Sequence, residues 1–259
     1  MITAEIPVTP AAPPPPALAR RAWVEHVMGT AVSIHVRAVE PTRPDIAAAV
    51  DRAFAHLRKA DAVLSTWRAD SDLLRLQHGE TDDIHPWVAE VAEHSLDADE
   101  RTDGLFRAWR ARPAARTVFD PTGLVKGWAV AGAGAHLDVL PEVAWSIGAG
   151  GDVAVGAGPG PSAAAPAWRI GLVDPHDAGR VADVVVLRRG AVATSGAAER
   201  GGHVVDPRTG RAVERPGSVT VAGPDLAWAD AWSTAAWVDP ERVRRLLAER
   251  DPEYRLIVL

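Results

Sequence analysis

The stretch Leu226-Ala-Trp-Ala-Asp-Ala-Trp-Ser-Thr-Ala-Ala-Trp237 predicts a short helix that carries more polar groups than its folding requires. Asp230, Ser233 and Thr234 are spaced i, i+3 and i+4, which places their side-chain oxygens on one helical face. We expect the other face to pack inward while these oxygens face a cleft. The inward face carries Trp228, Trp232, Ala235 and Ala236.

A carboxylate and two hydroxyls on one helical face are hard ligands, which suit Mg²⁺ or Ca²⁺ better than zinc. The stripe at Asp230, Ser233 and Thr234 is therefore a candidate metal site. The ordinary alternative is that Asp230 lies in the first turn and only complements the helix dipole.

Composition excludes several classes of protein. The chain has 259 residues, a net charge of −6 and no cysteine. The acidic balance argues against a nucleic-acid binder, and the missing thiols exclude thiolate metal sites and disulfides. The N-terminus lacks the charged start and apolar run of a secretory signal, and no apolar stretch is long enough for a membrane span. We expect a soluble, cytoplasmic protein.

The first half of the chain is predicted to be mainly helical. Residues 1–20 hold a run of prolines and read as a flexible lead-in, so the expected folded domain is 21–259. A strand is expected over residues 26–36, entered through Gly29, and apolar spacing predicts helices over 45–64 and 85–98. Ser71 can cap a short helix, and Thr102-Asp-Gly marks a turn.

The stretch from Thr117 to Trp128 is expected to run from a short strand through a glycine-bearing loop into a helix over 128–137. Such junctions expose backbone N–H groups and the positive end of a helix, so they suit a phosphate. Lys126 would add a positive charge there. The alternative is an ordinary connection with a solvated lysine.

Short strands dominate the second half, which favours an α+β fold over a βαβ array. A strand, glycine turn and strand are expected over 144–155, and no helix follows as a dinucleotide fingerprint would need. Further strands are predicted over 168–173, 181–187, 191–196 and 218–222, and 203–210 is predicted to be a strand that ends in a turn.

Several segments, taken together and in order, resemble one known family. They are Met28-Gly-Thr, Leu64 to Ser71, Asp120 to Ala129, Gly150-Gly-Asp152, Ala193-Thr-Ser-Gly196 with His203 to Gly210, and Ala229-Asp-Ala-Trp-Ser-Thr-Ala235. On these blocks the chain is similar to the ApbE family, the FAD:protein FMN transferases. The resemblance covers nearly everything after residue 22.

This resemblance implies a single α+β domain, T-fold-related, with mixed or antiparallel sheets flanked by helices. It also implies FAD as substrate and Mg²⁺ as the metal. Such enzymes transfer the FMN half of FAD to a threonine or serine hydroxyl of an acceptor flavoprotein, forming a phosphoester and releasing AMP.

By position, the resemblance assigns the metal to Asp230, Ser233, Thr234 and a backbone carbonyl near Gly123. The expected FAD contacts are Met28, Trp67, Gly104, Leu105, Phe106, Asp120, Lys126 and Val204. Thr194 and Ser195 are candidate donors to phosphate oxygens, although a tight turn capped by hydroxyls needs no ligand.

In-line attack by a hydroxyl benefits from a base, and His203 is the candidate because imidazole titrates near neutral pH. A partly buried, backbone-bonded histidine is the alternative interpretation of His203, and Asp206 is the substitute base.

Two other functions stay open. One is Mg²⁺-dependent hydrolysis of FAD to FMN and AMP, and the other is a non-catalytic FAD-binding carrier. The carrier is motivated by departures from the usual family residues at Arg107, Ala131 and Gly148. In addition, Trp67 replaces a usual tyrosine and keeps only its stacking face. The sequence identifies neither the acceptor protein nor its modified residue.

Overall fold

The structure is a computed structural model that describes residues 17–112, 116–160, 166–196 and 204–259. Its helices are α1 (Pro44–Leu64), α2 (Asp72–Gln77), α3 (Pro86–Arg101), α4 (Thr122–Asp138), α5 (Leu226–Val238) and α6 (Pro240–Arg250). Its strands are β1 (Ala19–Val27), β2 (Thr30–Ala38), β3 (Trp109–Arg112), β4 (Arg116–Phe119), β5 (Ala144–Ala149), β6 (Asp152–Ala157), β7 (Trp168–Asp174), β8 (Asp177–Leu187), β9 (Gly190–Gly196), β10 (Ser218–Gly223) and β11 (Arg255–Val258). None of the helices in these ranges is both long and apolar enough to cross a lipid bilayer.

The main sheet has seven strands in the order β1-β2-β5-β6-β9-β10-β11. Every neighbouring pair in it is antiparallel. Two hairpins, β3–β4 and β7–β8, form separate two-stranded sheets. The predicted α+β fold with antiparallel sheets and flanking helices is therefore confirmed.

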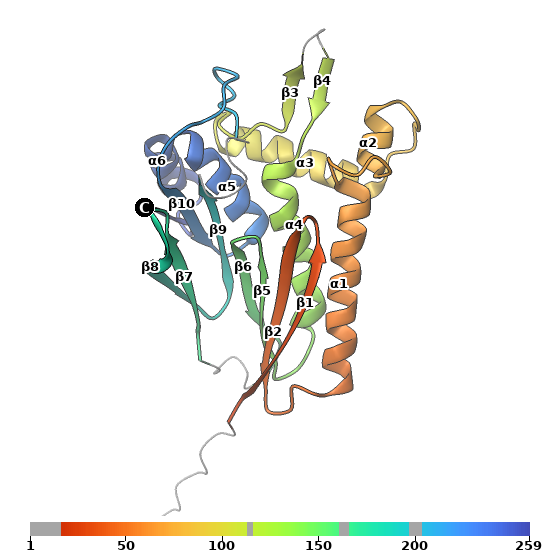
Figure 1. Ribbon diagram of the computed structural model, residues 1–259, viewed down its shortest axis with the longest axis vertical. Helices are drawn as coiled ribbons and strands as arrows, with labels where there is room; N and C mark the ends of the chain where they lie inside the picture. Colours follow the sequence, from red (N-terminus) through yellow and green to blue (C-terminus); the bar gives the residue numbers. More distant parts are fainter. Residues whose placement is uncertain (1–16, 113–115, 161–165, 197–203) are drawn as a thin grey trace, which may run out of the picture.

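Helices cover one face of the main sheet and the β7–β8 hairpin covers part of the other (Figure 1). Ser195 of β9 faces α5, because its hydroxyl pairs with that of Ser233. Side chains alternate along a strand, so Val192 faces the opposite side. There it packs against Leu172 of the hairpin in a small second core.

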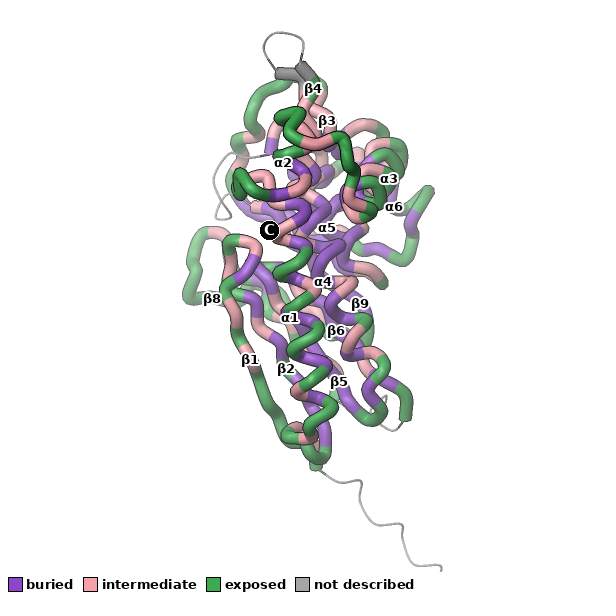
Figure 2. The backbone as a smooth tube through the Cα atoms, turned by 90° about the vertical axis from the view of Figure 1, so that its right-hand side faces the viewer, coloured by how far each residue is buried: buried purple, intermediate pink, exposed green. Residues whose placement is uncertain are grey.

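Helices α4 and α5 are buried almost all round, whereas α1 shows an exposed outer stripe (Figure 2). Both inner helices consist mostly of apolar residues, which is typical of helices enclosed by other elements. The expected one-sided burial of α5 is wrong: Trp232 is 0% exposed, but Asp230 and Ser233 are also only 4% and 0% exposed. The reason is that α5 lies between α4 and strands β9 and β10.

Glycines allow α4 and α5 to approach closely. A Cβ on Gly127 would lie 2.5 Å from the Leu226 carbonyl oxygen and 2.8 Å from Asp230 Cβ. One turn earlier, a Cβ on Gly123 would lie 2.9 Å from Thr234 Oγ1. The two glycines, four residues apart, therefore form one side-chain-free stripe that the polar face of α5 covers.

The structure differs from the predicted secondary structure in four places. The predicted loop at Gly123 and Lys126 is wrong, because α4 already begins at Thr122. Strand β1 begins at Ala19, two residues inside the predicted lead-in, and was not predicted as a strand. The strand predicted within 203–210 is wrong in its described part, where only one bridge joins Val205 to Ala212, whereas the predicted turn forms over 207–209. Helix α6 was not predicted, and Asp239 ends α5 and also caps α6 through the Arg242 amide.

Candidate functional site

The first turns of α4 meet the polar face of α5. The Gly127 amide donates to Asp230 Oδ2 at 3.0 Å, and Thr234 Oγ1 lies 3.4 Å from the Gly123 carbonyl oxygen that accepts its hydrogen bond. In a regular helix the Gly127 amide would bond to the Gly123 carbonyl four residues earlier. The Gly127 amide therefore also reaches the Asp230 carboxylate on the neighbouring helix. A carboxylate, a hydroxyl and a carbonyl therefore converge at this junction.

Ser233 is turned away from this group. Its hydroxyl donates to the Asp230 backbone carbonyl at 3.0 Å and pairs with Ser195 Oγ at 3.0 Å. At 100° per residue, Ser233 and Thr234 flank Asp230 on opposite sides. Thr234 thus reaches α4, while Ser233 joins α5 to β9.

Thr194 and Ser195 do not act on the same side of the sheet. The Thr194 hydroxyl pairs with Thr220 Oγ1 at 2.8 Å, across the β9–β10 ladder. Since neighbouring residues of a strand point to opposite faces, the Thr194 hydroxyl lies away from α5 and its amide alone reaches the helical side. That amide donates to Asp152 Oδ1 at 3.0 Å.

Lys126 and Asp152 form a close ion pair beside the α4–α5 junction. Lys126 Nζ lies 2.6 Å from Asp152 Oδ2, and the carboxylate is fully buried while the lysine side chain is 22% exposed. Burial raises the pKa of Asp152, and the Lys126 charge and the Thr194 amide offset this only in part. The pair therefore places the partly exposed Lys126 ammonium at the edge of the buried contacts between Asp152 and Thr194.

Glycine-containing turns lie at the same end of the sheet. The β1–β2 turn has Met28 at φ 55° and Gly29 at φ 70°, and the β5–β6 turn has Gly150 and Gly151 at φ 53° and 92°. Glycine adopts these left-handed conformations without strain, whereas Met28 does not. Asp152 is the first residue of β6, so the β5–β6 turn directly precedes the ion pair, and Thr30 after the β1–β2 turn lies against Gly150.

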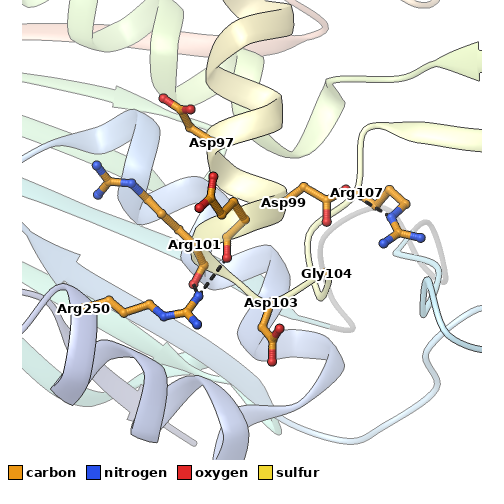
Figure 3. Close-up of a pocket in the computed structure, with 8 residues that line it drawn as sticks. Asp97, Asp99, Arg101, Asp103, Gly104, Arg107 and Arg250 are labelled. Atoms are coloured by element: carbon orange, nitrogen blue, oxygen red, sulfur yellow. Dashed lines mark hydrogen bonds and ion pairs between the residues drawn. The ribbon is translucent and has the colours of Figure 1, made fainter.

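The segment from Gly104 to Phe106 runs behind the junction. Leu105 and Phe106 are 2% and 3% exposed, and a Cβ on Gly123 would lie 3.1 Å from the Phe106 ring. Arg107 folds back across Gly104 to pair with Asp99 at 3.1 Å (Figure 3). A cavity of about 730 Å³ opens on this side, lined by charged residues of α3 and by Arg250.

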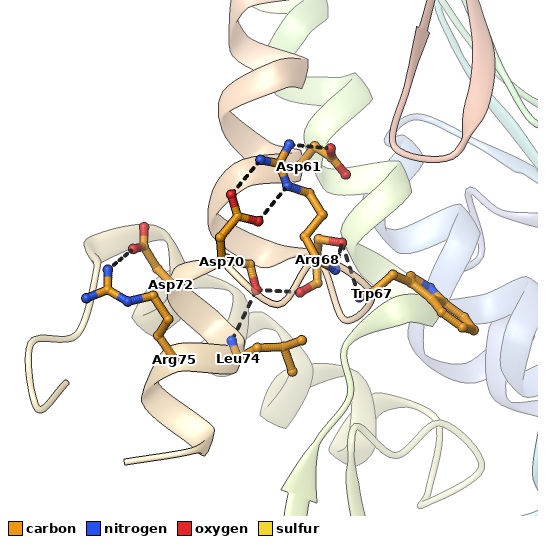
Figure 4. Close-up of polar contacts among 9 residues, drawn as sticks. Asp61, Trp67, Arg68, Asp70, Asp72, Leu74 and Arg75 are labelled. Atoms are coloured by element: carbon orange, nitrogen blue, oxygen red, sulfur yellow. Dashed lines mark hydrogen bonds and ion pairs between the residues drawn. The ribbon is translucent and has the colours of Figure 1, made fainter. Parts of the chain in front are cut away.

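Trp67 and Asp120 lie around the start of α4. Trp67 is 82% exposed and projects from the loop after α1 (Figure 4). Its backbone amide donates a hydrogen bond to Ser65 Oγ at 3.2 Å. The neighbouring Thr66 hydroxyl lies 3.4 Å from that of Thr122, and Thr122 donates to Asp120. The same loop ends at Ser71, which caps α2 as predicted.

Of the two candidate bases, the structure describes Asp206 but not His203. His203 lies outside the described residues. Asp206 is held by Arg208 through bonds to both carboxylate oxygens at 3.0 Å, and this contact lowers the pKa of Asp206. A carboxylate with a lowered pKa is a weaker base, which counts against Asp206 as the substitute. Val204 is 7% exposed and packs into the main core.

Comparison with known proteins decides the family. The ApbE family profile matches residues 28–111 and 107–258, which is most of the chain. The chain belongs to the ApbE family. The resemblance found in the sequence is therefore confirmed.

Among curated relatives of this ApbE protein, the FAD:protein FMN transferase of Salmonella typhimurium is 27% identical over 237 residues, covering 69% of this chain and 67% of its own. The FAD:protein FMN transferase of Escherichia coli K12 is 35% identical over 91 residues, which is 31% of this chain and 26% of its own length. The second match is thus a local one.

Solved ApbE structures share the fold. The ApbE protein of Thermotoga maritima superposes with a TM-score of 0.76 at 21% identity, covering 93% of this chain and 94% of its own. The flavin transferase ApbE of Vibrio cholerae gives a TM-score of 0.71 at 18% identity, covering 93% and 97%.

The positions at which this ApbE chain departs from the usual family residues are all ordered within the fold. Arg107 has its ion pair with Asp99, and Ala131 lies one turn beyond Gly127 on α4. A side chain at Gly148 would meet Ser33 Oγ at 3.2 Å. None of the three residues interrupts the α4–α5 junction.

The Asp152 carboxylate and the Gly127 amide make hydrogen bonds or ion pairs in the site, but neither was among the site residues predicted from the sequence. Asp152 was noted only as part of the Gly-Gly-Asp block, although a carboxylate directly after a glycine turn at a strand start was a usable signal. The Gly127 amide had no signal at all, because its role depends on the approach of α5.

Proposed function

We propose that this protein catalyses the Mg²⁺-dependent transfer of FMN from FAD to a threonine or serine hydroxyl of an acceptor flavoprotein, with release of AMP. The observation that carries the proposal is the convergence of Gly123, Asp230 and Thr234 at the α4–α5 junction, beside Lys126. Its membership of the ApbE family and the names of its curated relatives support the same activity.

The oxygen set fits Mg²⁺ in its chemistry. The Gly123 carbonyl, the Asp230 carboxylate and the Thr234 hydroxyl are all hard donors, and hard donors are what Mg²⁺ prefers. Asp230 is only 4% exposed, so its charge is poorly solvated and favours a bound cation. We leave Ser233 out of the set, because its hydroxyl is engaged by Ser195 and the Asp230 carbonyl.

Mg²⁺, when bound, would neutralise and orient a diphosphate and stabilise the charge on the departing AMP. Lys126 would bind a phosphate oxygen, since its side chain is partly exposed and its charge is held in place by Asp152. The amides at the start of α4 add the positive end of a helix dipole.

The flavin and adenine parts of FAD would be placed by residues around the junction. Trp67 offers an exposed ring for stacking. Asp120 lies just before α4, where it accepts from Thr122, and Met28 lies in the β1–β2 turn. Leu105, Phe106 and Val204 have buried side chains, so we assign any contact with FAD to their backbone groups. In the transfer itself, His203 would accept the proton of the attacking hydroxyl as the P–O bond to AMP breaks.

The activity is tested by incubating the protein with FAD, Mg²⁺ and a candidate acceptor flavoprotein. The proposal expects the acceptor to gain the mass of an FMN phosphoester while AMP appears in equal amount. AMP without a mass gain on any acceptor would indicate the hydrolase, and bound flavin without AMP would indicate the carrier.

Asp230→Asn is the sharpest single variant for the metal role. The amide oxygen can still accept from Gly127, so the fold is retained, while the negative charge is lost. AMP release is expected to fall by about 10²-fold or more, in line with the loss of a charged group that stabilises a transition state. Unchanged turnover with folded protein would refute Asp230 as a ligand. Asp97→Asn, on α3 at the cavity near Arg250, is the matched control.

A further inference from the structure

Strand β1 forms one edge of the main sheet and, among the described strands, pairs with β2 alone. It is nine residues long, and its register with β2 runs from Ala19 to Val27 without a shift. Edge strands are commonly kept short or interrupted by proline or a bulge, because their unpaired N–H and C=O groups attract another strand. The opposite edge, β11, is only four residues long. Strand β1 contains neither proline nor glycine, so it is long and regular enough to pair with a further strand.

The turn between β1 and β2 determines which backbone groups of β1 point outward. It has two residues, Met28 and Gly29, so Val27 and Thr30 form the hydrogen-bonded pair that closes the hairpin. Hydrogen-bonded and non-hydrogen-bonded pairs alternate along an antiparallel ladder, so the N–H and C=O groups of every second residue of β1 face away from β2. Figure 2 shows β1 along one side of the molecule. The outward-facing residues are Arg20, Ala22, Val24 and His26, and all four are exposed.

One face of β1 carries opposite charges on either side of a tryptophan. Arg21, Trp23 and Glu25 alternate along the face toward α1, where Trp23 is partly buried against the core. The Arg21 guanidinium lies 4.8 Å from the centroid of the Trp23 ring. Glu25 Oε2 pairs with Arg58 of α1 at 2.6 Å, and the Glu25 side chain stays 39% exposed. A cation and an anion therefore lie two residues before and two residues after Trp23.

We propose that β1 pairs antiparallel with β1 of a second copy of this chain, about a two-fold axis that passes between the two Trp23 residues. Arg21 of each copy then lies directly opposite Glu25 of the other, and the symmetry makes this pair twice. The two Trp23 residues meet as a non-hydrogen-bonded pair, in which side chains are closest. Ala22 of each copy meets Val24 of the other as a hydrogen-bonded pair, which exchanges two hydrogen bonds.

The backbone and the charges together select this register. Outward-facing residues must meet outward-facing residues, so the two-fold axis has to pass through a residue and not between two residues. An axis at Ala22 would place Arg21 opposite Trp23, and an axis at Val24 would place Glu25 opposite Trp23. The axis at Trp23 pairs Arg21 with Glu25 and also keeps all nine residues of β1 paired.

Charged side chains usually protect an edge strand from self-association, because like charges meet when two copies approach. In β1 the self-pairing register brings unlike charges together, so Arg21 and Glu25 favour a second copy as the partner. The contact is only one strand wide, so we expect a weak dimer with a Kd of about 1–100 μM. It does not involve the α4–α5 junction and does not depend on the proposed function.

The test is sedimentation velocity of the full chain over concentrations from about 1 to about 200 μM. The wild type should shift from the 27.4 kDa monomer toward a dimer as the concentration rises. Arg21→Glu and Glu25→Arg should each weaken dimerisation by at least about tenfold, because each reversal acts twice across the axis. The double variant Arg21→Glu/Glu25→Arg restores unlike pairs and should dimerise within about threefold of the wild type. Arg245→Glu, at an exposed position of α6, is the matched control and should dimerise like the wild type.

Val24→Pro tests the backbone pairing. The Val24 amide faces away from β2, so proline leaves the β1–β2 ladder intact, removes a donor from the open edge and should abolish the dimer. The unfolding temperature reports whether this variant folds, and the charge swap remains the readout if it does not. Arg58→Ala removes the intrachain partner of Glu25 and should not weaken the dimer.

Four results would each overturn the inference. They are a wild type that stays monomeric up to about 200 μM, single charge variants that dimerise like the wild type, a charge swap that fails to restore the dimer, and a dimer that persists in folded Val24→Pro. The last result would place the interface on another surface.

Discussion

Gly123 shows how one small residue supports the proposed metal site. Its carbonyl accepts from Thr234, and its Cα is enclosed by Thr234 and the Phe106 ring. A methyl group there would lie 2.9 Å from Thr234 Oγ1 and 3.1 Å from the ring, closer than such atoms normally approach. The absence of a side chain is therefore a condition for the carbonyl and the hydroxyl to meet.

Gly123→Ala should displace Thr234 from the α4 turn and weaken the activity more than the fold. We expect Mg²⁺-dependent AMP release to drop by about tenfold or more, as a small misplacement of reacting groups commonly causes. The measurement is turnover as a function of Mg²⁺ concentration, together with the thermal unfolding temperature. Gly179→Ala, in the exposed β7–β8 hairpin, is the control. Wild-type turnover in Gly123→Ala would contradict the account.

Asp251, at the end of α6, forms hydrogen bonds to α3 and α5, so we expect it to contribute to the stability of the fold and not to the reaction. It is 5% exposed at the end of α6 and accepts from Arg101 Nη1 of α3 at 2.9 Å and from Trp232 Nε1 of α5 at 3.0 Å. Asp251→Ala would leave the fully buried indole N–H unpaired. The free energy of unfolding should fall by about 2–3 kcal/mol, the usual cost of losing such bonds.

Thermal unfolding measures the effect, and Asp251→Asn is the control because it keeps an acceptor for Trp232. The asparagine variant should lose less stability than the alanine variant. Equal unfolding temperatures for Asp251→Ala and the wild type would show that these bonds contribute nothing to the helix packing.

His56 makes the packing of α1 against α4 sensitive to pH. Its Nε2 is buried without a hydrogen-bond partner in the described residues, and a Cβ on Gly132 would lie 2.4 Å from it. Burial lowers the pKa of His56, His136 and Lys59 lower it further, and Glu90 opposes them. The folded protein therefore disfavours the protonated ring, and the unfolded chain binds more protons below about pH 6.5.

It follows that the free energy of unfolding should fall as the pH decreases from 7 to 5, and less steeply in His56→Leu than in the wild type. Denaturant titrations at several pH values give the two slopes, with pH 8 as the reference at which the ring is neutral in both states. Identical slopes for the two proteins would rule out His56 as a source of the pH dependence.

Elements with strong periodicity were predictable, and elements made by tertiary contact were not. The spacing over residues 45–64 and 85–98 is a local property, and α1 and α3 form there. The start of α4 contains Gly123 and Gly127, which read as a loop because their helical state depends on α5. Strand β1 was hidden by the proline run before it and by its mostly exposed side chains.

The site draws on parts of the chain that are far apart in sequence. Lys126, Asp152, Ser195 and Asp230 come from α4, β6, β9 and α5, and the hydrogen bonds among these elements fix their relations. The family resemblance could name most of these residues. It could not tell that Ser233 bonds to β9 or that the Thr194 hydroxyl faces the other side of the sheet, since both depend on register and helix rotation.

At the scale of the whole molecule, the sheet has two chemically distinct ends. One carries the α4–α5 junction, with a carboxylate and a lysine. The other carries a cavity lined by Arg188 and Arg189 beside Trp168. The two ends are separated by the length of the strands, so the residues that line this cavity are not in contact with those of the junction.

The central claim is that Gly123, Asp230 and Thr234 together hold the divalent metal. The most direct measurement is anomalous scattering from crystals of the wild type and Asp230→Asn grown with Mn²⁺ in place of Mg²⁺. The account predicts one strong peak within coordination distance of the Gly123 carbonyl, the Asp230 carboxylate and Thr234 Oγ1, and its loss in the variant. A peak elsewhere in the molecule, or one that persists unchanged in Asp230→Asn, would contradict it.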